Sequence, residues 1–262
     1  MDREFYTDIN SRTIDGWVKD GWEWGIPVSA ETFQRAKEGD WEIFLTPTKP
    51  VPRDWFPPLR GRRVLGLAAG GGQQMPLLAA QGAICVVLDY SDRQLENDRF
   101  VADREGYTIE TVKADMTKRL PFDDGSFDMI LHPVSNCYVE DVYHVWNEAC
   151  RVLKPQGLLI AGMDNGFRYM FDDETRQPLT VVNKLPYNPL TNPVLYNRDL
   201  QENGGIQFSH TVEEQVGGQI RAGFILTGLY EDRDREGQGL LRDYMPQYLV
   251  TLAYKPRSGL WD

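Results

Sequence analysis

The chain has few cysteines, and their spacing builds neither a disulfide framework nor a thiolate metal site. Its 262 residues include three cysteines, Cys85, Cys137 and Cys150, and no C-x-x-C pair. A sparse, odd set is untypical of a disulfide-rich secreted domain or of a zinc site with thiolate ligands. Cys85 lies in an apolar run, which is typical of a buried free thiol. We therefore predict no metal site and a reducing, cytoplasmic setting.

Long apolar runs and a signal peptide are also missing. No stretch approaches the roughly 20 consecutive apolar residues that a membrane helix needs. The first residues, MDREF, lack the basic start and apolar segment of a secretory signal. We expect a protein with no membrane segment.

Positive charge is in short supply. Lysine and arginine number 28 against 39 aspartates and glutamates, a formal net charge of −11. The densest basic cluster is Arg60, Arg62 and Arg63, too small to bind a phosphate backbone along its length. Nucleic acid is therefore disfavoured as the main partner. A 41% share of apolar residues excludes a disordered chain, and the length suits one large domain with a small appendage.

Tryptophan, by contrast, is abundant at the start of the chain. Five of the seven tryptophans fall in the first 55 residues, and a proline-rich connector follows at residues 47–58. Proline at this density suits neither a helix nor a central strand. We predict that residues 1–58 form a cap of short helices. Its tryptophans either anchor the cap to the core or wall a ligand pocket.

Beyond residue 62, short apolar runs alternate with stretches of helical periodicity. Continuous apolar runs of this length are typical of strands buried on both faces. We predict strands at residues 64–68, 84–88, 107–112, 127–131, 158–161, 224–230 and 248–254. Strands that alternate with helices predict βαβ units, hence a parallel sheet with helices on both faces.

Two helices are predicted between these strands. Apolar residues recur at spacings of three and four from Val139 to Leu153, and the residues 154–157, KPQG, should end that helix. Asp92 is the predicted N-cap of a second helix over residues 93–105.

Three later segments have their own signals. Residues 165–208 are rich in proline and asparagine and predict a long insertion on the substrate side. Thr211 and Glu214 have the spacing of a capping box at a helix start. Residues 232–242 predict a charged, exposed turn.

A glycine-rich loop is the strongest chemical signal. Residues 64–74, VLGLAAGGGQQ, predict a strand, a glycine turn and a helix start. Such a turn lets a ligand approach the backbone, and the helix N-terminus favours negative groups. A P-loop would need lysine where Gly72 stands, and a dinucleotide fingerprint would need glycine where Met75 stands. Both of these interpretations are disfavoured.

Four motifs in register make residues 60–164 resemble class I S-adenosylmethionine-dependent methyltransferases, in the broad small-molecule group. Residues 68–72 match the family's glycine-rich motif. Asp89, 17 positions after Gly72, matches the acid that accepts from ribose hydroxyls, and residues 114–116 match the adenine motif. Residues 127–130, FDMI, and 150–157, CRVLKPQG, match the fourth strand and the turn that follows the next helix.

The resemblance implies a fold and a cofactor. The fold is α/β and Rossmann-like, with a seven-stranded, mostly parallel sheet, helices on both faces and one antiparallel strand. A helical cap over residues 1–58 would precede a catalytic domain over 59–262. The cofactor is S-adenosylmethionine, with S-adenosylhomocysteine as product. The residues assigned to it are Ala68, Ala69, Gly70, Gly72, Gln73, Asp89, Tyr90, Asp115, Met116 and His132.

Two positions depart from the family's pattern. Gly66 stands where the family usually has an acid that helps to hold the cofactor ammonium, and Ala68 replaces the first glycine. The ammonium must then find other acceptors. The candidates are the loop carbonyls, the carbonyls of His132 and Pro133, and the cap residues Asp8, Asn10 and Asp15.

Methyl transfer is an in-line displacement, so the protein mainly positions the nucleophile. His132, at the end of the fourth strand, is the candidate general base, and a purely structural histidine is the alternative. Of the other histidines, His144 is assigned to packing or the surface, and His210 is a weak substrate-loop candidate. The candidate substrate residues, between the cap, the 133–138 loop and the insertion, are Tyr6, Trp24, Asn136 and Tyr138. With Trp17 and Trp22, they suit an aromatic or cationic molecule.

We predict methyl transfer from S-adenosylmethionine to a small-molecule acceptor. Two alternatives stay open. The Gly66 departure would suit a module that binds the cofactor or its product without transfer. A methyltransferase acting on RNA or protein is opposed by the acidic composition. The sequence names neither the acceptor nor the oligomeric state.

Overall fold

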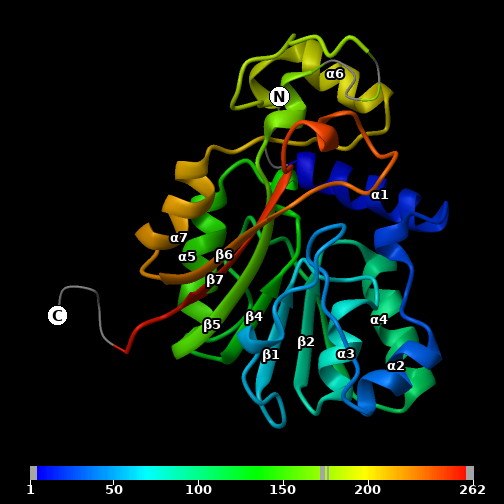
Figure 1. Cartoon of the computed structure of the whole chain (residues 1–262), viewed down its shortest axis with the longest axis vertical. Helices are drawn as coiled ribbons and strands as arrows, with labels where there is room; N and C mark the ends of the chain where they lie inside the picture. The colour runs from blue at the N-terminus through cyan, green and yellow to red at the C-terminus, as the bar shows by residue number, and fades with distance from the viewer. Residues whose placement is uncertain (1–4, 172–174, 176, 258–262) are drawn as a thin grey trace.

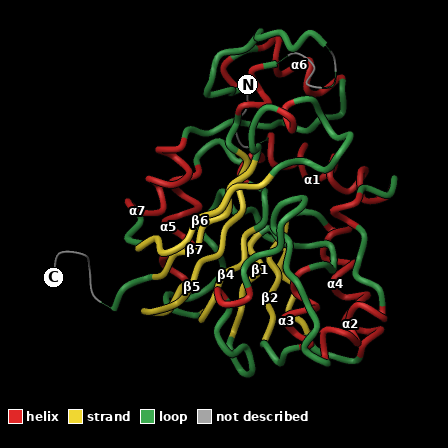
Figure 2. Tube along the Cα trace, viewed as in Figure 1, coloured by secondary structure: helices red, strands yellow, loops and turns green. Residues whose placement is uncertain are grey.

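The computed structural model describes residues 5–171, 175 and 177–257. A seven-stranded sheet in the order β3-β2-β1-β4-β5-β7-β6 forms its centre (Figures 1 and 2). β7 runs antiparallel to both neighbours, and the other strands are parallel to one another. The strands are β1 (Arg63–Leu67), β2 (Ile84–Asp89), β3 (Ile109–Lys113), β4 (Phe127–His132), β5 (Leu153–Asp164), β6 (Ile225–Asp232) and β7 (Tyr248–Tyr254). The predicted fold class is confirmed.

Helices cover both faces of this sheet (Figure 1). The α-helices are α1 (Tyr6–Lys19), α2 (Ala30–Lys37), α3 (Gln74–Ala80), α4 (Asp92–Glu105), α5 (Val142–Val152), α6 (Pro193–Gln201) and α7 (Gly218–Arg221). Among the described residues, no helix is long and apolar enough to cross a membrane. The predicted capping box is present, because Glu214 N–H donates to Thr211 Oγ1 and Thr211 N–H donates to the Glu214 carboxylate. Glu214 of this box lies in a π-helical turn, Glu213–Gly217.

Alternate side chains of the central strands enter two separate cores. Leu65 and Leu67 of β1 pack with Trp146 of α5 on one face. Val64 packs with Met75 of the α3 region on the other face. Both faces of β1 are therefore dry, which is why its sequence is continuously apolar rather than alternating.

Several predicted boundaries were wrong. Ser91, not Asp92, caps α4, because its hydroxyl accepts from Gln94 N–H. β1 ends before Ala68, which has a positive φ of 49°. α5 ends at Val152 and β5 begins at the next residue, so residues 154–157 lie within the strand segment.

The predicted exposed turn at 232–242 was also wrong at its first residue. Asp232 is buried at the end of β6 and accepts from the backbone N–H groups of Thr48 and Lys49. The proline-rich connector after α2 is thereby fixed to the sheet. Residues between α2 and this connector, among them Trp41, Ile43 and Leu45, belong to the same core as α3.

α1 and the insertion share a small core of their own. Tyr6 of α1 packs with Ile206 and Phe208 of the insertion. Asn10 is hydrogen-bonded to both backbone groups of Ile206, donating to the carbonyl at 2.9 Å and accepting from the N–H at 2.6 Å. The first helix is therefore bonded to a segment about 200 residues later in the chain.

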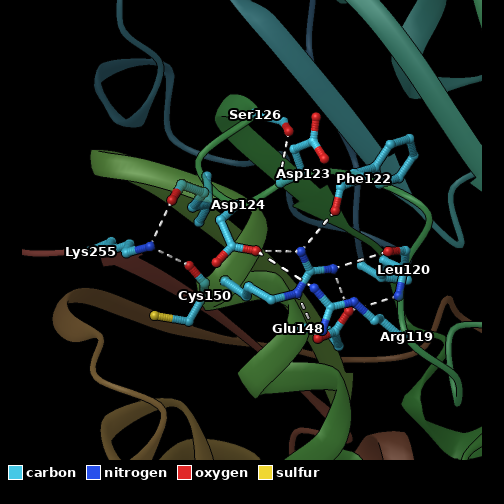
Figure 3. A network of polar contacts seen from close by, with 11 residues as sticks. Arg119, Leu120, Phe122, Asp123, Asp124, Ser126, Glu148, Cys150 and Lys255 are labelled. Carbon is cyan, nitrogen blue, oxygen red and sulfur yellow. Dashed lines mark hydrogen bonds and ion pairs between the residues drawn. The ribbon is translucent and has the colours of Figure 1, made fainter.

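Arg151, one of the matched residues 150–157, has a structural role at the end of α5. Figure 3 shows the network of polar contacts around Glu148, Leu120 and Phe122. Arg151 forms an ion pair with Glu148 at 2.7 Å and donates to the carbonyls of Leu120 and Phe122. The bond to Arg151 is the largest cause that holds the pKa of Glu148 below its usual value. Glu148 in turn accepts from Leu120 N–H at 2.7 Å. The network fixes the loop between β3 and β4 against α5.

Candidate functional site

The functional residues lie where the parallel strands end. β1, β2, β4 and β5 all finish at one edge of the sheet, since they are parallel. β1 is also the point where the strand order reverses, with β2 on one side and β4 on the other. Doubly wound sheets bind ligands in the crevice at such a point.

A cavity of about 630 Å³ opens at this edge. Its floor comes from the strand ends, and its walls come from α1, the segment after it and the insertion. Ligand pockets for small molecules and cofactors have volumes of roughly 300–1,000 Å³. The predicted site residues that line it are Ala68, Gly70, Gln73, Asp89, Tyr90, Asp115, Met116, Trp24 and Tyr138.

Asp89, at the end of β2, is oriented by backbone donors. Its Oδ2 accepts from Gly70 N–H at 3.0 Å, and its Oδ1 accepts from Ser91 N–H at 2.9 Å. Each carboxylate oxygen can accept a second bond. Burial raises the pKa of Asp89 above its usual value, and the backbone donors oppose that rise.

Asp115 follows β3 on the same side of the cavity. Its Oδ1 accepts from Thr117 N–H at 2.8 Å, which fixes the side chain in a local turn. Met116 lines the cavity beside it. The two carboxylates therefore stand at the ends of adjacent strands, as the resemblance implies.

The glycine loop leaves no room for side chains. A Cβ on Gly70 would lie 2.9 Å from Asp89 Oδ2, and one on Gly71 would lie 2.7 Å from the Trp24 carbonyl. Gly71 and Gly72 also have positive φ values of 112° and 68°. Glycine is required here by conformation and by close approach alike.

The segment before the sheet is bonded directly to the residues beside Asp89. Ser11 of α1 donates to the Tyr90 carbonyl at 2.7 Å, and Tyr90 Oη donates to Asp8 at 2.6 Å. Asp15 accepts from Ser91 Oγ at 2.6 Å and from Arg93 N–H at 3.1 Å. α1 therefore covers the carboxyl end of β2 through side chains of its own.

The remaining predicted site residues do not line the cavity. His132 is fully buried, with Nδ1 at 2.8 Å from the Leu67 carbonyl and Nε2 at 2.8 Å from Asn136 Oδ1. Its ring also packs edge-on against Trp146. Burial lowers its pKa, and neither nitrogen faces the cavity. This geometry favours a structural role for His132, and we do not propose it as the general base.

The other predicted residues outside the cavity lining support the structure around it. Asn136 bridges His132 and Gln215, and Tyr6 Oη accepts from Glu140 N–H at 3.2 Å. Ala69 is buried in the loop, and the Gly72 carbonyl accepts from Val28 N–H at 2.9 Å. His210 Nε2 lies 3.0 Å from the Asn136 carbonyl, so it supports the same loop.

At Gly66, which stands in place of the family's acid, Met75 occupies the space that a side chain would need. A Cβ on Gly66 would lie 2.9 Å from both Cγ and Sδ of Met75. Of the predicted substitutes for that acid, Asp8 and Asp15 are bonded to the loop after β2 and do not line the cavity. Pro133 and Asn10 do line it.

The far end of the cavity contains residues that sequence reasoning did not single out. Asp164 ends β5, is 5% exposed and accepts from Gly166 N–H at 2.7 Å. Burial raises its pKa, which the nearby Arg168 opposes. An acid at the end of a parallel strand could have identified Asp164 from the sequence, because Asp89 also ends such a strand.

Three aromatic rings form a continuous wall, which we call the aromatic wall: Trp17, Trp22 and Tyr138. The ring centroids of Trp17 and Trp22 are 5.4 Å apart, and those of Trp17 and Tyr138 are 6.4 Å apart. All three line the cavity. Four of its described lining residues are aspartates and one is an arginine, so the cavity favours cationic or neutral ligands.

Comparison with known proteins agrees with this geometry. Residues 65–161 match the family model described as a methyltransferase domain. Over 250 residues the chain is 47% identical to the uncharacterized methyltransferase YbaJ of Bacillus subtilis (strain 168), covering 94% of this chain and 97% of that protein.

Solved structures share the fold. An S-adenosylmethionine-dependent methyltransferase from Mesorhizobium loti superposes with a TM-score of 0.61 at 23% identity, over 78% of this chain and 95% of that one. Geranyl diphosphate C-methyltransferase from Streptomyces coelicolor A3(2), a complex with S-adenosylhomocysteine, gives a TM-score of 0.52 at 14% identity, over 75% and 73%. The family model and the 47% identical relative match a chain whose motifs surround one cavity. The chain therefore belongs to the S-adenosylmethionine-dependent methyltransferase family.

Proposed function

We propose that the protein transfers a methyl group from S-adenosylmethionine to a small molecule held in the cavity. The observation that carries this is the enclosure of Asp89, Asp115 and the glycine loop in one cavity by α1 and the insertion. A large polymer would have to displace α1, which is bonded to both sides of the site. A cytoplasmic location is part of the proposal, consistent with three free cysteines.

Each part of the cofactor has residues suited to it. Asp89 would accept from the two ribose hydroxyls, and Asp115 with the Met116 N–H would read the adenine edge. Gly70 and Ala68 would let the amino-acid part approach the backbone, and the loop and Pro133 carbonyls would accept from its ammonium. When bound, the cofactor supplies an electrophilic methyl group on sulfur.

The chain's own residues orient the acceptor and exclude water. The aromatic wall packs against the acceptor, and Tyr90 with α1 closes the ribose side. Where the acceptor atom carries a proton, we assign Asp164 to receive it. A carboxylate with a raised pKa is a better proton acceptor than an ordinary one.

Replacing Trp22 with alanine is expected to raise the KM for the acceptor about three- to tenfold, because a ring contact contributes about 0.5–1.5 kcal/mol. Trp22→Phe should retain most of the affinity. The same result is expected for Trp24→Ala, because Trp24 also lines the cavity. Affinity for S-adenosylhomocysteine, measured by calorimetry, should change less than twofold. An unchanged KM in Trp22→Ala would contradict the aromatic wall as the acceptor site.

Transfer itself is tested with methyl-labelled S-adenosylmethionine and an extract of Bacillus subtilis, the source of the 47% identical relative. The extract is divided by ultrafiltration into metabolites and macromolecules. We expect label in the metabolite fraction only, and none with the Asp89→Ala variant. Label in the RNA or protein fraction would favour a macromolecular acceptor. Tight cofactor binding with no transfer to either fraction would favour a binding module.

A further inference from the structure

A carboxyl group lies beneath the glycine loop, outside the cavity lining. Asp98 of α4 is 0% exposed. The Gly71 N–H is shared between Asp98 Oδ2 and the Gln94 carbonyl, each at 3.0 Å. Asp98 therefore satisfies a buried amide of the loop that would otherwise lose its solvent partner.

The second oxygen of Asp98 has no hydrogen-bond partner among the described residues, and neither has Gln94 Oε1. Gln94 lies four residues earlier on α4, on the same face of the helix. A Cβ on Gly71 would lie 2.9 Å from that Gln94 oxygen, so both groups face the same glycine. Two acceptors are left without a donor, and a proton on Asp98 Oδ1 would turn that oxygen into a donor for Gln94 Oε1.

Burial and one neighbouring charge, Asp89 at the end of β2, oppose the ionisation of Asp98. The thiol of Cys85 and the phenol of Tyr107 also lie near Asp98, and burial keeps both uncharged by raising their pKa values. Arg99 is the cation nearest in the chain, but it donates to Thr111 at 2.9 Å. Burial, with the charge of Asp89, raises the pKa of Asp98 to about 8.

We propose that Asp98 is a positioning residue for cofactor binding, kept as a neutral carboxylic acid that bonds the glycine loop with one oxygen and Gln94 with the other. Its effect reaches the cofactor through the loop, because Gly70 N–H in turn donates to Asp89. The other side of the loop is held by Val28 N–H on the Gly72 carbonyl. Ionisation would place a second charge beside Asp89 and remove the donor to Gln94. The inference rests on the proposed cofactor site.

The test compares Asp98→Asn with Asp98→Ala, and uses Asp103→Asn, an exposed position on the same helix, as control. Asparagine reproduces the neutral acid, because its oxygen accepts from the loop and its amide donates to Gln94. S-adenosylhomocysteine affinity is measured by calorimetry from pH 6.5 to 9. At pH 6.5 we expect Asp98→Asn within twofold of wild type and Asp98→Ala about tenfold weaker.

The pH profile separates positioning from mere packing. Relative to Asp98→Asn, wild-type affinity should fall about tenfold as pH rises through about 8, the pKa of the ionising group. A wild-type profile parallel to that of Asp98→Asn would overturn the proposal, as would wild-type affinity in Asp98→Ala. If wild type binds no S-adenosylhomocysteine at any pH, it is the proposed function that fails.

Thermal unfolding without cofactor gives a second readout. Between the unfolded pKa of about 4 and the folded pKa of about 8, the folded state binds more protons than the unfolded state. The stability of the wild type therefore falls as pH rises through this window. Asp98→Asn has no titrating group at this position, so its stability lacks this dependence. The Tm of Asp98→Asn minus that of wild type should grow from pH 5 to 8 and then level off. A constant difference would show that Asp98 does not titrate there.

Discussion

Replacing Asp89 with alanine is expected to weaken S-adenosylhomocysteine binding by about 100-fold or more. In the proposed site its carboxylate accepts from two ribose hydroxyls, and each charge-assisted bond contributes about 1.5–3 kcal/mol. The substitution also removes the acceptor that fixes Gly70 N–H at 3.0 Å. Isothermal titration calorimetry measures the loss directly.

Asp92 provides a matched control three residues later. It is exposed, pairs with Lys113 at 2.7 Å and does not line the cavity. Asp92→Ala should therefore leave the affinity within twofold. Equal affinity in Asp89→Ala and wild type would remove Asp89 from the ribose site and, with it, the central assignment of the cofactor.

The pH dependence of cofactor binding follows from the Asp89 carboxylate. Its pKa is raised by burial, and only the anion accepts from both hydroxyls. Affinity is thus full above this pKa and falls as pH drops through it, at a higher pH than an ordinary aspartate would give. Asp89→Asn, which cannot ionise, should lack this acidic limb.

The sequence predicted the parts of the site that depend on strand ends. Continuous apolar runs predicted the strands β1, β2 and β4, which are buried on both faces. Asp89 was identified as the acid at the end of such a run. Asp115, which follows the alternating run of β3, was assigned through the family resemblance. Local chemistry at the carboxyl edge is therefore readable, because a parallel sheet brings these ends together regardless of the loops.

Contacts between distant segments could not be predicted in this way. The bonds from Ser11 to Tyr90 and from Asn10 to Ile206 join segments 79 and 196 residues apart. Whether a side chain at a strand end points into the cavity depends on its neighbours as well. His132 points away because the Leu67 carbonyl and Asn136 hold both ring nitrogens.

Restoring the family's acid by Gly66→Asp is expected to harm the protein rather than improve cofactor binding. The new Cβ would stand 2.9 Å from Met75 Cγ and Sδ and 3.1 Å from Ala69 Cβ, in the buried part of β1. Overpacking costs about 1–3 kcal/mol, and a buried carboxyl group without a partner adds about 1–3 kcal/mol. Urea titration should show a free energy of unfolding lower by about 3 kcal/mol, and calorimetry should show weaker S-adenosylhomocysteine binding.

A second substitution tests whether Met75 is the cause. Met75→Ala removes the atoms that the Cβ would meet, so the double variant Gly66→Asp/Met75→Ala should be less destabilised than the sum of the single variants. Gly16→Ala is the control for glycine replacement as such, because a Cβ there meets nothing within 4 Å. It should leave stability unchanged or slightly raised, since alanine favours a helix. Tighter binding by Gly66→Asp alone would show that the strand has room for the acid. The steric account of Gly66 would then be wrong, and the absence of the acid would need a different cause.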